Sequence, residues 1–396
     1  MVTALENDST GDAVLRTRVL RTAAEVEAER ERLRTVPWAR VDADPDFFLA
    51  VVSTSEGALR PHVVLVERRS EIAGAFVGRI EDVRRTIRFG YASIARVPVR
   101  SLTLVHGGLV GDDDVEVSAL LLAELEAALA QGDADLVAVP SLRPDTPFDS
   151  ALGAIPRRRL RRGEYRPHHR LVLPESYEAL LASWTKKTRY NVRRQSELLE
   201  RALAPDLSFR ILRRPEDAAQ VIADLERVAS STYQRALGAG FADNDLYRSL
   251  VPLALRHGWL RAYVLYHRAA PIAFWHAYAY RRTLHVSTTG YDAAYAEHSP
   301  GTHVQMEMFR DACEDDSVDV VDFGLGDAQY KQRFGSEMWS ERDATLFAAR
   351  PRAFALGLAE RTVEIAARAA ARMLRATGLT DAVKRRWRRR LRADAD

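Results

Sequence analysis

The sequence predicts an α+β protein in which one folding unit occurs twice, each copy a mixed, mostly antiparallel sheet flanked by helices. Its 396 residues are about two or three times the commonest domain length. Strand-like and helix-like runs recur in the same order in both halves of the chain, which indicates an internal repeat. The content of 47% hydrophobic and 29% charged residues allows a sizeable core and excludes the disordered and fibrous classes.

The first copy begins with runs of β-forming residues, separated by short polar breaks of the kind found in hairpins. Apolar residues at helical spacing then predict a helix over 115–131, which Gly132 ends. A strand, a short helix and a last strand complete the copy. The predicted strands are 62–68, 72–80, 85–92, 101–110, 134–140 and 168–174, and the short helix lies near 145–153.

The second copy repeats this order, and three helices precede it. Pro215, followed by two acidic residues, is a favourable start for the second of these helices, because acidic side chains complement the helix dipole there. The predicted strands are 261–267, 272–280, 284–291, 318–323 and 343–349, and the predicted helices are 185–203, 215–238, 244–256, 301–314 and 327–334.

These runs predict four parts of the chain. A flexible N-terminus over 1–15 is followed by a first unit over 16–175, which lacks a cofactor site. A second unit over 176–349 carries the cofactor site, and a helical, basic tail occupies 350–396. The acidic, polar N-terminus does not fit a signal peptide, and no run of 18 apolar residues occurs, so we expect a cytoplasmic protein.

Cysteine and charge content narrow the classes of partner. Cys313 is the single cysteine, which excludes an intrachain disulfide and an all-cysteine metal site and fits a reducing compartment. The net charge is only +3, although the tail concentrates seven cations, so the rest of the chain is mildly acidic. A surface that binds nucleic acid throughout is therefore not expected. The tail cations are Lys384, Arg385, Arg386, Arg388, Arg389, Arg390 and Arg392.

The start of the predicted 301–314 helix has the features of an anion site. Ser299 is a favourable cap, Pro300 fits the first helical position, and Gly301 leaves the backbone bare ahead of Thr302. Free N–H groups and the positive end of the helix dipole would then face a phosphate. The equivalent junction of the first copy carries three aspartates, 112–114, which would repel one. A phosphate-bearing cofactor is therefore expected in the second unit only.

Several short motifs, in this order, resemble a known family. They are Tyr291, Tyr295, Ser299-Pro300-Gly301, Asp322-Phe323-Gly324-Leu325-Gly326, Tyr330-Lys331, Phe334-Gly335 and the basic run 186–194. Together with the order of strands and helices, they resemble the GNAT acyltransferases of the CelD/BcsL type, relatives of the Fem-type aminoacyl transferases that carry two GNAT units. The resemblance covers about residues 45–345. It implies two tandem GNAT-like units and acetyl-CoA or another acyl-CoA as co-substrate, with no metal.

The sequence departs from the GNAT pattern at one point. The usual cofactor loop, (Gln/Arg)-x-x-Gly-x-(Gly/Ala), is absent, and the Ser-Pro-Gly turn stands in its place. We expect the cofactor to be held by Ser299, Pro300, Gly301, Thr302, Gly324 and Gly326.

Acyl transfer from a thioester to an amine needs a route for the amine proton, a donor for the oxyanion and an acid for the leaving thiolate. The resemblance makes Tyr330 the acid, and Lys331 would stabilise the oxyanion or anchor an acceptor phosphate. Asp322, His276 and Glu307 are candidates for the base, and a chain of waters is the alternative.

Each candidate also has a structural interpretation. Asp322 is equally well explained as support for the turn at Gly324, and Tyr330 and Phe334 as a packed aromatic pair at helical spacing. His276 is more simply a core histidine on a strand face. The adjacent histidines 168 and 169 point opposite ways in a strand, so no metal site is expected there.

The basic segments raise the question of the partner. Lys186, Lys187, Arg189 and Arg193, together with Tyr291, are candidates for binding a phosphorylated acceptor, with a solvated helix face as the alternative. In the tail, Trp387 and Leu391 among the cations of 384–392 fit contact with an anionic membrane surface, with a solvated tail or RNA binding as alternatives.

Three functions follow from the sequence. The first is an acyltransferase that moves an acyl group from acyl-CoA to an amine or hydroxyl acceptor. The resemblance implies an acceptor in polysaccharide or cell-envelope synthesis, and we expect a cytoplasmic enzyme with peripheral contact at the inner face of the membrane. The second is a Fem-type transferase that uses aminoacyl-tRNA and acts on a peptidoglycan precursor. The third is a degenerate GNAT pair that acts as a binding subunit.

Overall fold

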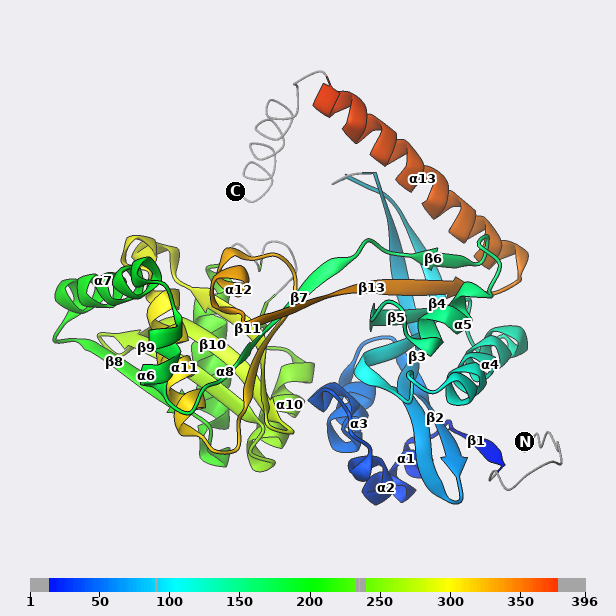
Figure 1. Cartoon of the computed structure of the whole chain (residues 1–396), viewed down its shortest axis with the longest axis horizontal. Helices are drawn as coiled ribbons and strands as arrows, with labels where there is room; N and C mark the ends of the chain where they lie inside the picture. The colour runs from blue at the N-terminus through cyan, green and yellow to red at the C-terminus, as the bar shows by residue number, and fades with distance from the viewer. Residues whose placement is uncertain (1–13, 90–91, 233–234, 236–239, 377–396) are drawn as a thin grey trace. The chain divides into compact units, whose positions relative to one another are not determined.

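The structure is a computed structural model that describes residues 14–89, 92–232, 235 and 240–376 (Figure 1). The chain forms two compact units. Unit 1 comprises Met1–Pro37, Glu56–Glu164 and Arg342–Asp396, and unit 2 comprises Trp38–Ser55 and Tyr165–Glu341. The basic run 384–392 and most of the predicted flexible N-terminus lie outside the described residues, although Leu15 already begins the first strand.

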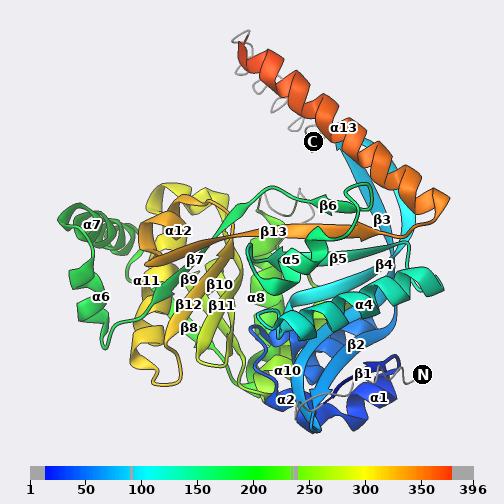
Figure 2. The same cartoon turned by 45° about the vertical axis from the view of Figure 1, so that its right-hand side comes forward.

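Unit 1 is built on four antiparallel strands in the order β1-β2-β3-β4, which a helix, α4, connects to β5. β5 runs parallel to β4, and the C-terminal half of β13 is antiparallel to β5 (Figure 2). The strands are β1 (Leu15–Leu20), β2 (Ala58–Arg68), β3 (Glu71–Phe89), β4 (Ala92–Val110), β5 (Leu136–Leu142), β6 (Leu160–Arg162) and β13 (Glu337–Phe347). The helices are α1 (Ala23–Ala28), α2 (Arg30–Thr35), α4 (Val115–Gln131), α5 (Pro147–Gly153) and α13 (Pro351–Ala376).

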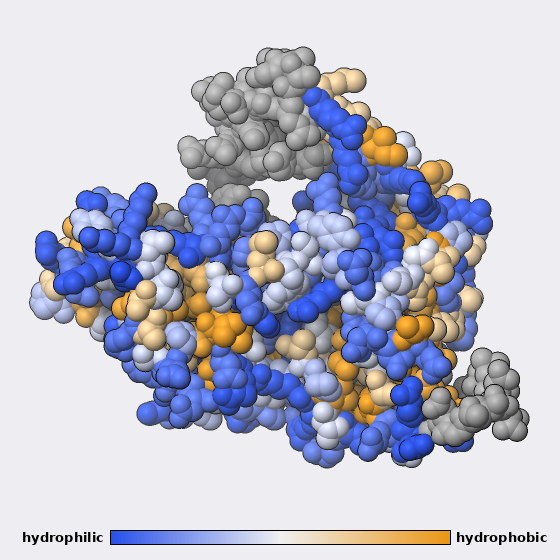
Figure 3. Space-filling view, in the orientation of Figure 1, coloured by the Kyte–Doolittle hydropathy of each residue, from blue (hydrophilic) through white to orange (hydrophobic). Residues whose placement is uncertain are grey.

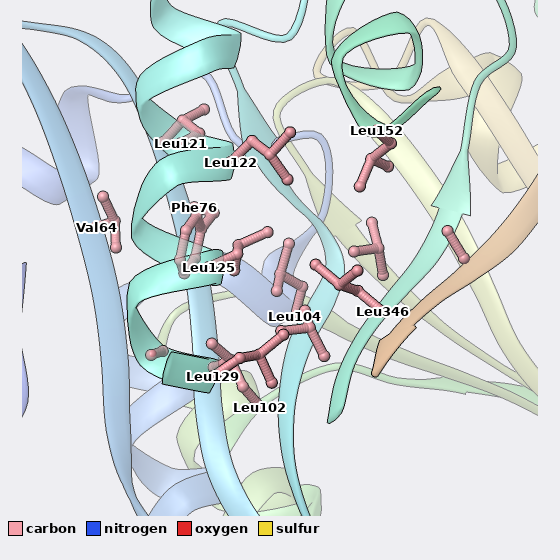
Figure 4. Packing of buried hydrophobic residues seen from close by; sticks show 14 of the residues in the cluster. Val64, Phe76, Leu102, Leu104, Leu121, Leu122, Leu125, Leu129, Leu152 and Leu346 are labelled. Atoms are coloured by element: carbon pink, nitrogen blue, oxygen red, sulfur yellow. The ribbon is translucent and has the colours of Figure 1, made fainter. Parts of the chain in front are cut away.

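Helix α4 forms as the sequence predicts and covers one face of this sheet. Asp114 caps it by accepting the N–H groups of Glu116 and Val117, and Gly132 ends it with a left-handed φ of 87°. Its leucines point into the core against strand residues (Figure 4). The labelled core residues, which come from α4, α5 and the strands, are Val64, Phe76, Leu102, Leu104, Leu121, Leu122, Leu125, Leu129, Leu152 and Leu346.

Unit 2 repeats this arrangement. Strands β8-β9-β10-β11 are antiparallel, β12 is parallel to β11, and β7 and the N-terminal half of β13 extend the sheet. The strands are β7 (Arg166–Val172), β8 (Leu207–Leu212), β9 (Leu260–His267), β10 (Ala270–Tyr280), β11 (Thr283–Tyr291) and β12 (Val320–Leu325). The helices are η1 (Val41–Ala43), α3 (Pro45–Thr54), α6 (Tyr177–Ser183), α7 (Lys186–Leu203), η2 (Pro215–Asp217), α8 (Ala218–Ser230), α10 (Asp245–Arg256), η3 (Ala293–His298), α11 (Pro300–Glu314) and α12 (Gln329–Phe334).

In each unit, the two parallel strands pair over only three residues and then separate. In unit 2, β11 and β12 are in register only over Thr283–His285 and Val320–Asp322. In unit 1, β4 and β5 are in register only over Ser101–Thr103 and Leu136–Ala138. Beyond these residues the paired strands separate. The predicted α+β fold of two repeated units is confirmed.

The compact units differ from the predicted boundaries of 16–175 and 176–349. Residues 38–55 and 165–175 belong to unit 2, and residues 342–349 belong to unit 1. The cause is strand pairing, because β7 adds to β12 and the C-terminal half of β13 adds to β5. The predicted strand 72–80 and residues 85–89 of the predicted strand 85–92 are also parts of one long strand, β3.

Candidate functional site

The turn that opens α11 differs in detail from the predicted anion cradle. Pro300 is the first helical residue, as expected, but Ser299 has a left-handed φ of 52° and its side chain makes no capping hydrogen bond. The N–H groups of Thr302 and His303 both donate to the Ser299 carbonyl, at 3.0 and 3.4 Å. A capping side chain needs an extended backbone, which explains the difference. Within the described residues, the Gly301 N–H is the first-turn donor that stays available to a ligand.

The matching turn of unit 1 is already occupied. There the Asp114 carboxylate accepts the N–H groups of Glu116 and Val117 at 2.9 and 3.0 Å. These hydrogen bonds help to hold the pKa of Asp114 below its ordinary value, so the cap stays charged at neutral pH. At this helix a phosphate would have to displace the Asp114 carboxylate. At α11 the Ser299 side chain makes no capping hydrogen bond that a phosphate would have to replace.

Trp275, on β10, joins the α11 turn to α12. Its Nε1 donates to the Gly301 carbonyl at 3.1 Å, and its ring meets the Tyr330 ring edge-on with 5.3 Å between centroids. Tyr330 also lies edge-on to Phe323, on β12, at 5.8 Å. A Cβ atom at Gly301 would lie 3.7 Å from the Tyr291 side chain, and Tyr291 is an exposed residue. The structure therefore brings Gly301, Tyr291 and Tyr330 together on the face of the sheet that α11 covers.

Tyr330 is suited to donate a proton rather than to accept one. Burial raises the pKa of its phenol to about 12, so the hydroxyl is protonated throughout the physiological range. Within the described part of the chain, no hydrogen bond to this hydroxyl is found. The group is thus a neutral donor whose hydrogen-bonding capacity is open to a ligand.

His276 lies on the other face of the same sheet. Successive residues of a strand point to opposite faces, so His276 points away from Trp275. It is fully buried against the rings of Phe241 and Tyr247, and burial lowers the pKa of its imidazole to about 4. The structure therefore does not bring His276 together with Tyr330, and a packed, neutral core histidine fits its surroundings.

Asp322 is the centre of a buried charged network. Its Oδ1 accepts the His168 Nε2–H at 2.7 Å and the Gly324 N–H at 2.6 Å, while its Oδ2 accepts the His285 Nδ1–H at 3.1 Å and lies 3.5 Å from Arg40. Burial opposes the charge, but the hydrogen bonds from the two histidines hold the pKa of Asp322 well below its ordinary value. A carboxylate with so many donors is a weak base.

His168 links this carboxylate to a second one. Its Nδ1 lies 3.2 Å from Glu341, and its ring stacks on Trp339 with 4.3 Å between centroids. Burial opposes a positive charge, yet the hydrogen bond to Asp322 and the nearby Glu341 carboxylate raise the pKa of His168. The sequence predicts Asp322 but misses His168, His285, Arg40 and Glu341. Only the register of β11 on β12 places His285 beside Asp322.

Lys331 holds the turn between β12 and α12. It is buried, and its Nζ donates to the carbonyls of Leu325 and Gly324 at 2.6 and 3.3 Å. Burial lowers the pKa of this amine. Gly324 and Gly326 have left-handed φ values of 69° and 108° in the same turn. These three residues shape the segment that carries Tyr330.

The basic residues of α7 lie on the surface, and Figure 3 shows hydrophilic residues over this helix. Arg189 donates to the carbonyls of Trp184 and Ala182 at 2.7 and 3.0 Å and so caps the end of α6. Arg193 pairs with Glu197 at 2.9 Å. Lys186 and Lys187 are exposed and have no ion pair within the described residues.

Two further findings concern the described residues as a set. No group of three or more His, Cys, Asp or Glu side chains in them is arranged to hold a metal ion. No helix in the ranges that the structure describes is both long and apolar enough to cross a bilayer.

The Asp322 network gives a testable pH dependence. We expect Asp322→Asn to lower the free energy of unfolding by about 3 kcal/mol near pH 6, because it leaves buried partners without their charge. The folded-state pKa of His168 is raised and that of Asp322 is lowered. The network therefore stabilises the fold fully at pH values between the ordinary pKa of an aspartate and that of a histidine. This stabilisation is lost as pH rises through the raised pKa of His168 or falls through the lowered pKa of Asp322.

Denaturant unfolding of wild type and variant at about pH 6 and about pH 9 measures this difference. Asp316→Asn, at an exposed position, is the matched control and should leave stability unchanged. A difference between wild type and Asp322→Asn that is the same at both pH values, or larger at the higher one, would contradict this account of the network.

The comparisons with known proteins agree with this geometry. Residues 186–332 match the family model described as "Acetyltransferase (GNAT) domain". No curated protein matches the chain in sequence. Among solved structures, FemX aligns with a TM-score of 0.58 at 10% identity, over 84% of this chain and 98% of its own. A protein of unknown function from Bacteroides thetaiotaomicron aligns with a TM-score of 0.50 at 12% identity, over 82% of this chain and 97% of its own.

A tandem GNAT protein from the clavulanic acid biosynthesis pathway also aligns, at 12% identity and a TM-score of 0.48, over 84% of this chain and 99% of its own. The family match spans the part of unit 2 that contains Trp275, the α11 turn and Tyr330. Residues 186–332 thus match a GNAT acetyltransferase domain, and the chain shares its overall fold with FemX.

Proposed function

We propose that this protein is an acyltransferase that moves an acyl group from acyl-CoA to an amine or hydroxyl acceptor, with unit 2 as the catalytic unit. One observation carries the proposal. Trp275 holds a helix N-terminus, at Gly301, and an unpartnered phenol, at Tyr330, on one face of the sheet. The GNAT domain match over the same residues supports this function.

The coenzyme would bind along the opening between β11 and β12. Its diphosphate would accept the Gly301 N–H at the positive end of the 15-residue helix α11. Its pantetheine amides would pair with the backbone of β11 or β12 beyond Asp322, where the two strands no longer pair with each other. This orientation directs the thioester end toward Tyr330.

Tyr330 has the one direct role in the proposed chemistry. As the acceptor amine attacks the thioester carbonyl, the carbon–sulfur bond breaks and the Tyr330 hydroxyl donates its proton to the leaving thiolate. His276 points to the other face and Asp322 is held as a weak base, so we propose that solvent takes the amine proton and returns a proton to the Tyr330 phenolate. Lys331, Gly324 and Gly326 act by fixing the turn that positions Tyr330.

The acceptor is proposed from the basic surface. Lys186 and Lys187 on α7 are exposed and suit an acceptor that carries a phosphate, such as a nucleotide-linked or lipid-linked amino sugar. The CelD/BcsL-type resemblance would place such an acceptor in polysaccharide or cell-envelope synthesis. Transfer at the cytoplasmic face of the membrane fits a lipid-linked acceptor.

The same cations favour a second candidate, Fem-type transfer from aminoacyl-tRNA. Neutralising several phosphates of a tRNA would make binding depend steeply on salt, whereas acyl-CoA use predicts no tRNA binding. Filter binding of bulk tRNA at rising salt separates the two. Tight binding with a steep salt slope, which Lys186→Ala/Lys187→Ala weakens, would favour the tRNA-dependent reaction over ours.

Acetyl-CoA binding tests the α11 turn. We expect Gly301→Glu to weaken acetyl-CoA binding by at least about tenfold, because it places a carboxylate where the diphosphate would lie. Gly301→Ala is the matched control, since its Cβ makes only an ordinary contact with Tyr291. Isothermal titration measures both. Equal affinities of the two variants would contradict the site, and no binding by wild type would favour the third candidate, a degenerate GNAT pair acting as a binding subunit.

Turnover tests the acid. We expect Tyr330→Phe to lower the rate of thiol release by about 100-fold with acetyl-CoA affinity nearly unchanged, because the hydroxyl acts on the leaving group. Tyr247→Phe removes a hydroxyl on the opposite face of the sheet and serves as the control. Thiol release is followed with amino-sugar acceptors. A parallel loss of binding and turnover would make Tyr330 a structural residue instead.

A further inference from the structure

Within the described residues, helix α13 packs against the rest of unit 1 through one face. Leu356 lies in a buried cluster with Ile87, Val99 and Phe347, and a Cβ at Gly357 would lie 3.1 Å from the Phe347 ring. The close approach at Gly357 shows how tightly this side is packed. The opposite side of the helix faces away from the unit 1 sheet.

This outward face of α13 is unusually apolar. Phe354, Leu358, Ile365 and Met373 are exposed by 38, 55, 60 and 70%. At 100° per residue they fall on one side of the helix, and the exposed alanines 355, 359, 366 and 369 lie among them. A helix side that faces water is normally polar, so this side indicates a partner.

The charges on α13 are divided between its two faces. The acidic side chains, Glu360 and Glu364, bind Arg85 and Arg161 within unit 1. The exposed Arg361 and Arg372 flank the apolar residues, with no acidic side chain of α13 on that side. In Figure 3 hydrophobic and hydrophilic residues lie side by side along this helix. The outward face thus combines apolar side chains with positive charge that no acidic side chain of α13 balances.

We propose that the outward face of α13 binds the surface of an anionic lipid bilayer, with the helix lying in the plane of the interface. Apolar side chains enter the boundary between headgroups and acyl chains, and flanking arginines bind anionic headgroups. A second copy of the chain fits less well, because a symmetric contact would bring the same arginines together. In the sequence, a run that contains seven cations, 384–392, follows this helix.

Vesicle co-sedimentation of the full chain tests this proposal. We expect binding to vesicles of about 70% phosphatidylcholine and 30% phosphatidylglycerol, and little binding to phosphatidylcholine alone. Leu358→Glu/Ile365→Glu should lower the bound fraction at least about tenfold, because two buried apolar contacts are lost and two negative charges are added. Arg361→Gln/Arg372→Gln should weaken binding less and reduce its salt dependence.

The matched control is Leu59→Glu/Leu198→Glu, which makes the same chemical change at exposed positions on other surfaces. It should bind vesicles like wild type, and thermal melts should show all variants folded. Wild-type binding by Leu358→Glu/Ile365→Glu would overturn the proposal. So would equal binding to neutral vesicles, or a wild-type dimer in light scattering that this variant converts to a monomer.

Discussion

The buried carboxylate of Asp322 fixes the point at which the unit 2 sheet opens. It stands at the last register pair of β11 and β12, where it receives His285 from one neighbouring strand and His168 from the other. Arg40 approaches the same carboxylate from the segment before α3. One negative charge therefore ties together three strands and an N-terminal segment. A buried charge is tolerated only when it has such partners, so the network and the opening depend on each other.

The two faces of this sheet separate the buried histidines from the proposed active site. His276 and His285 lie buried on the face of the sheet that α8, α10 and α3 cover, where hydrogen bonds hold them. Trp275, Phe323 and Tyr330 lie on the face that α11 covers, and there the Gly301 N–H and the Tyr330 hydroxyl stay available. Successive side chains of a strand point to opposite faces of the sheet. Residues adjacent in sequence, such as Trp275 and His276, therefore have different surroundings.

Local patterns predict much of the fold, and long-range pairing explains most of what they miss. The leucine spacing and Gly132 give α4, and Pro300 gives the start of α11. The predicted helix 327–334 contains Tyr330, which lies on α12. No local signal shows that β7 adds to β12 or that Arg40 reaches Asp322, because these contacts depend on sheet register. Lys331 is buried and donates to backbone carbonyls, which its place in the sequence does not indicate. The left-handed backbone of Ser299 keeps its side chain from capping α11.

A structure of the full chain with bound acetyl-CoA tests the central claim most directly, since it locates both ends of the coenzyme at once. We expect the diphosphate at the Gly301 N–H and the thioester sulfur within hydrogen-bonding distance of the Tyr330 hydroxyl. A coenzyme bound to unit 1, or one whose sulfur lies on the His276 face of the sheet, would contradict the account.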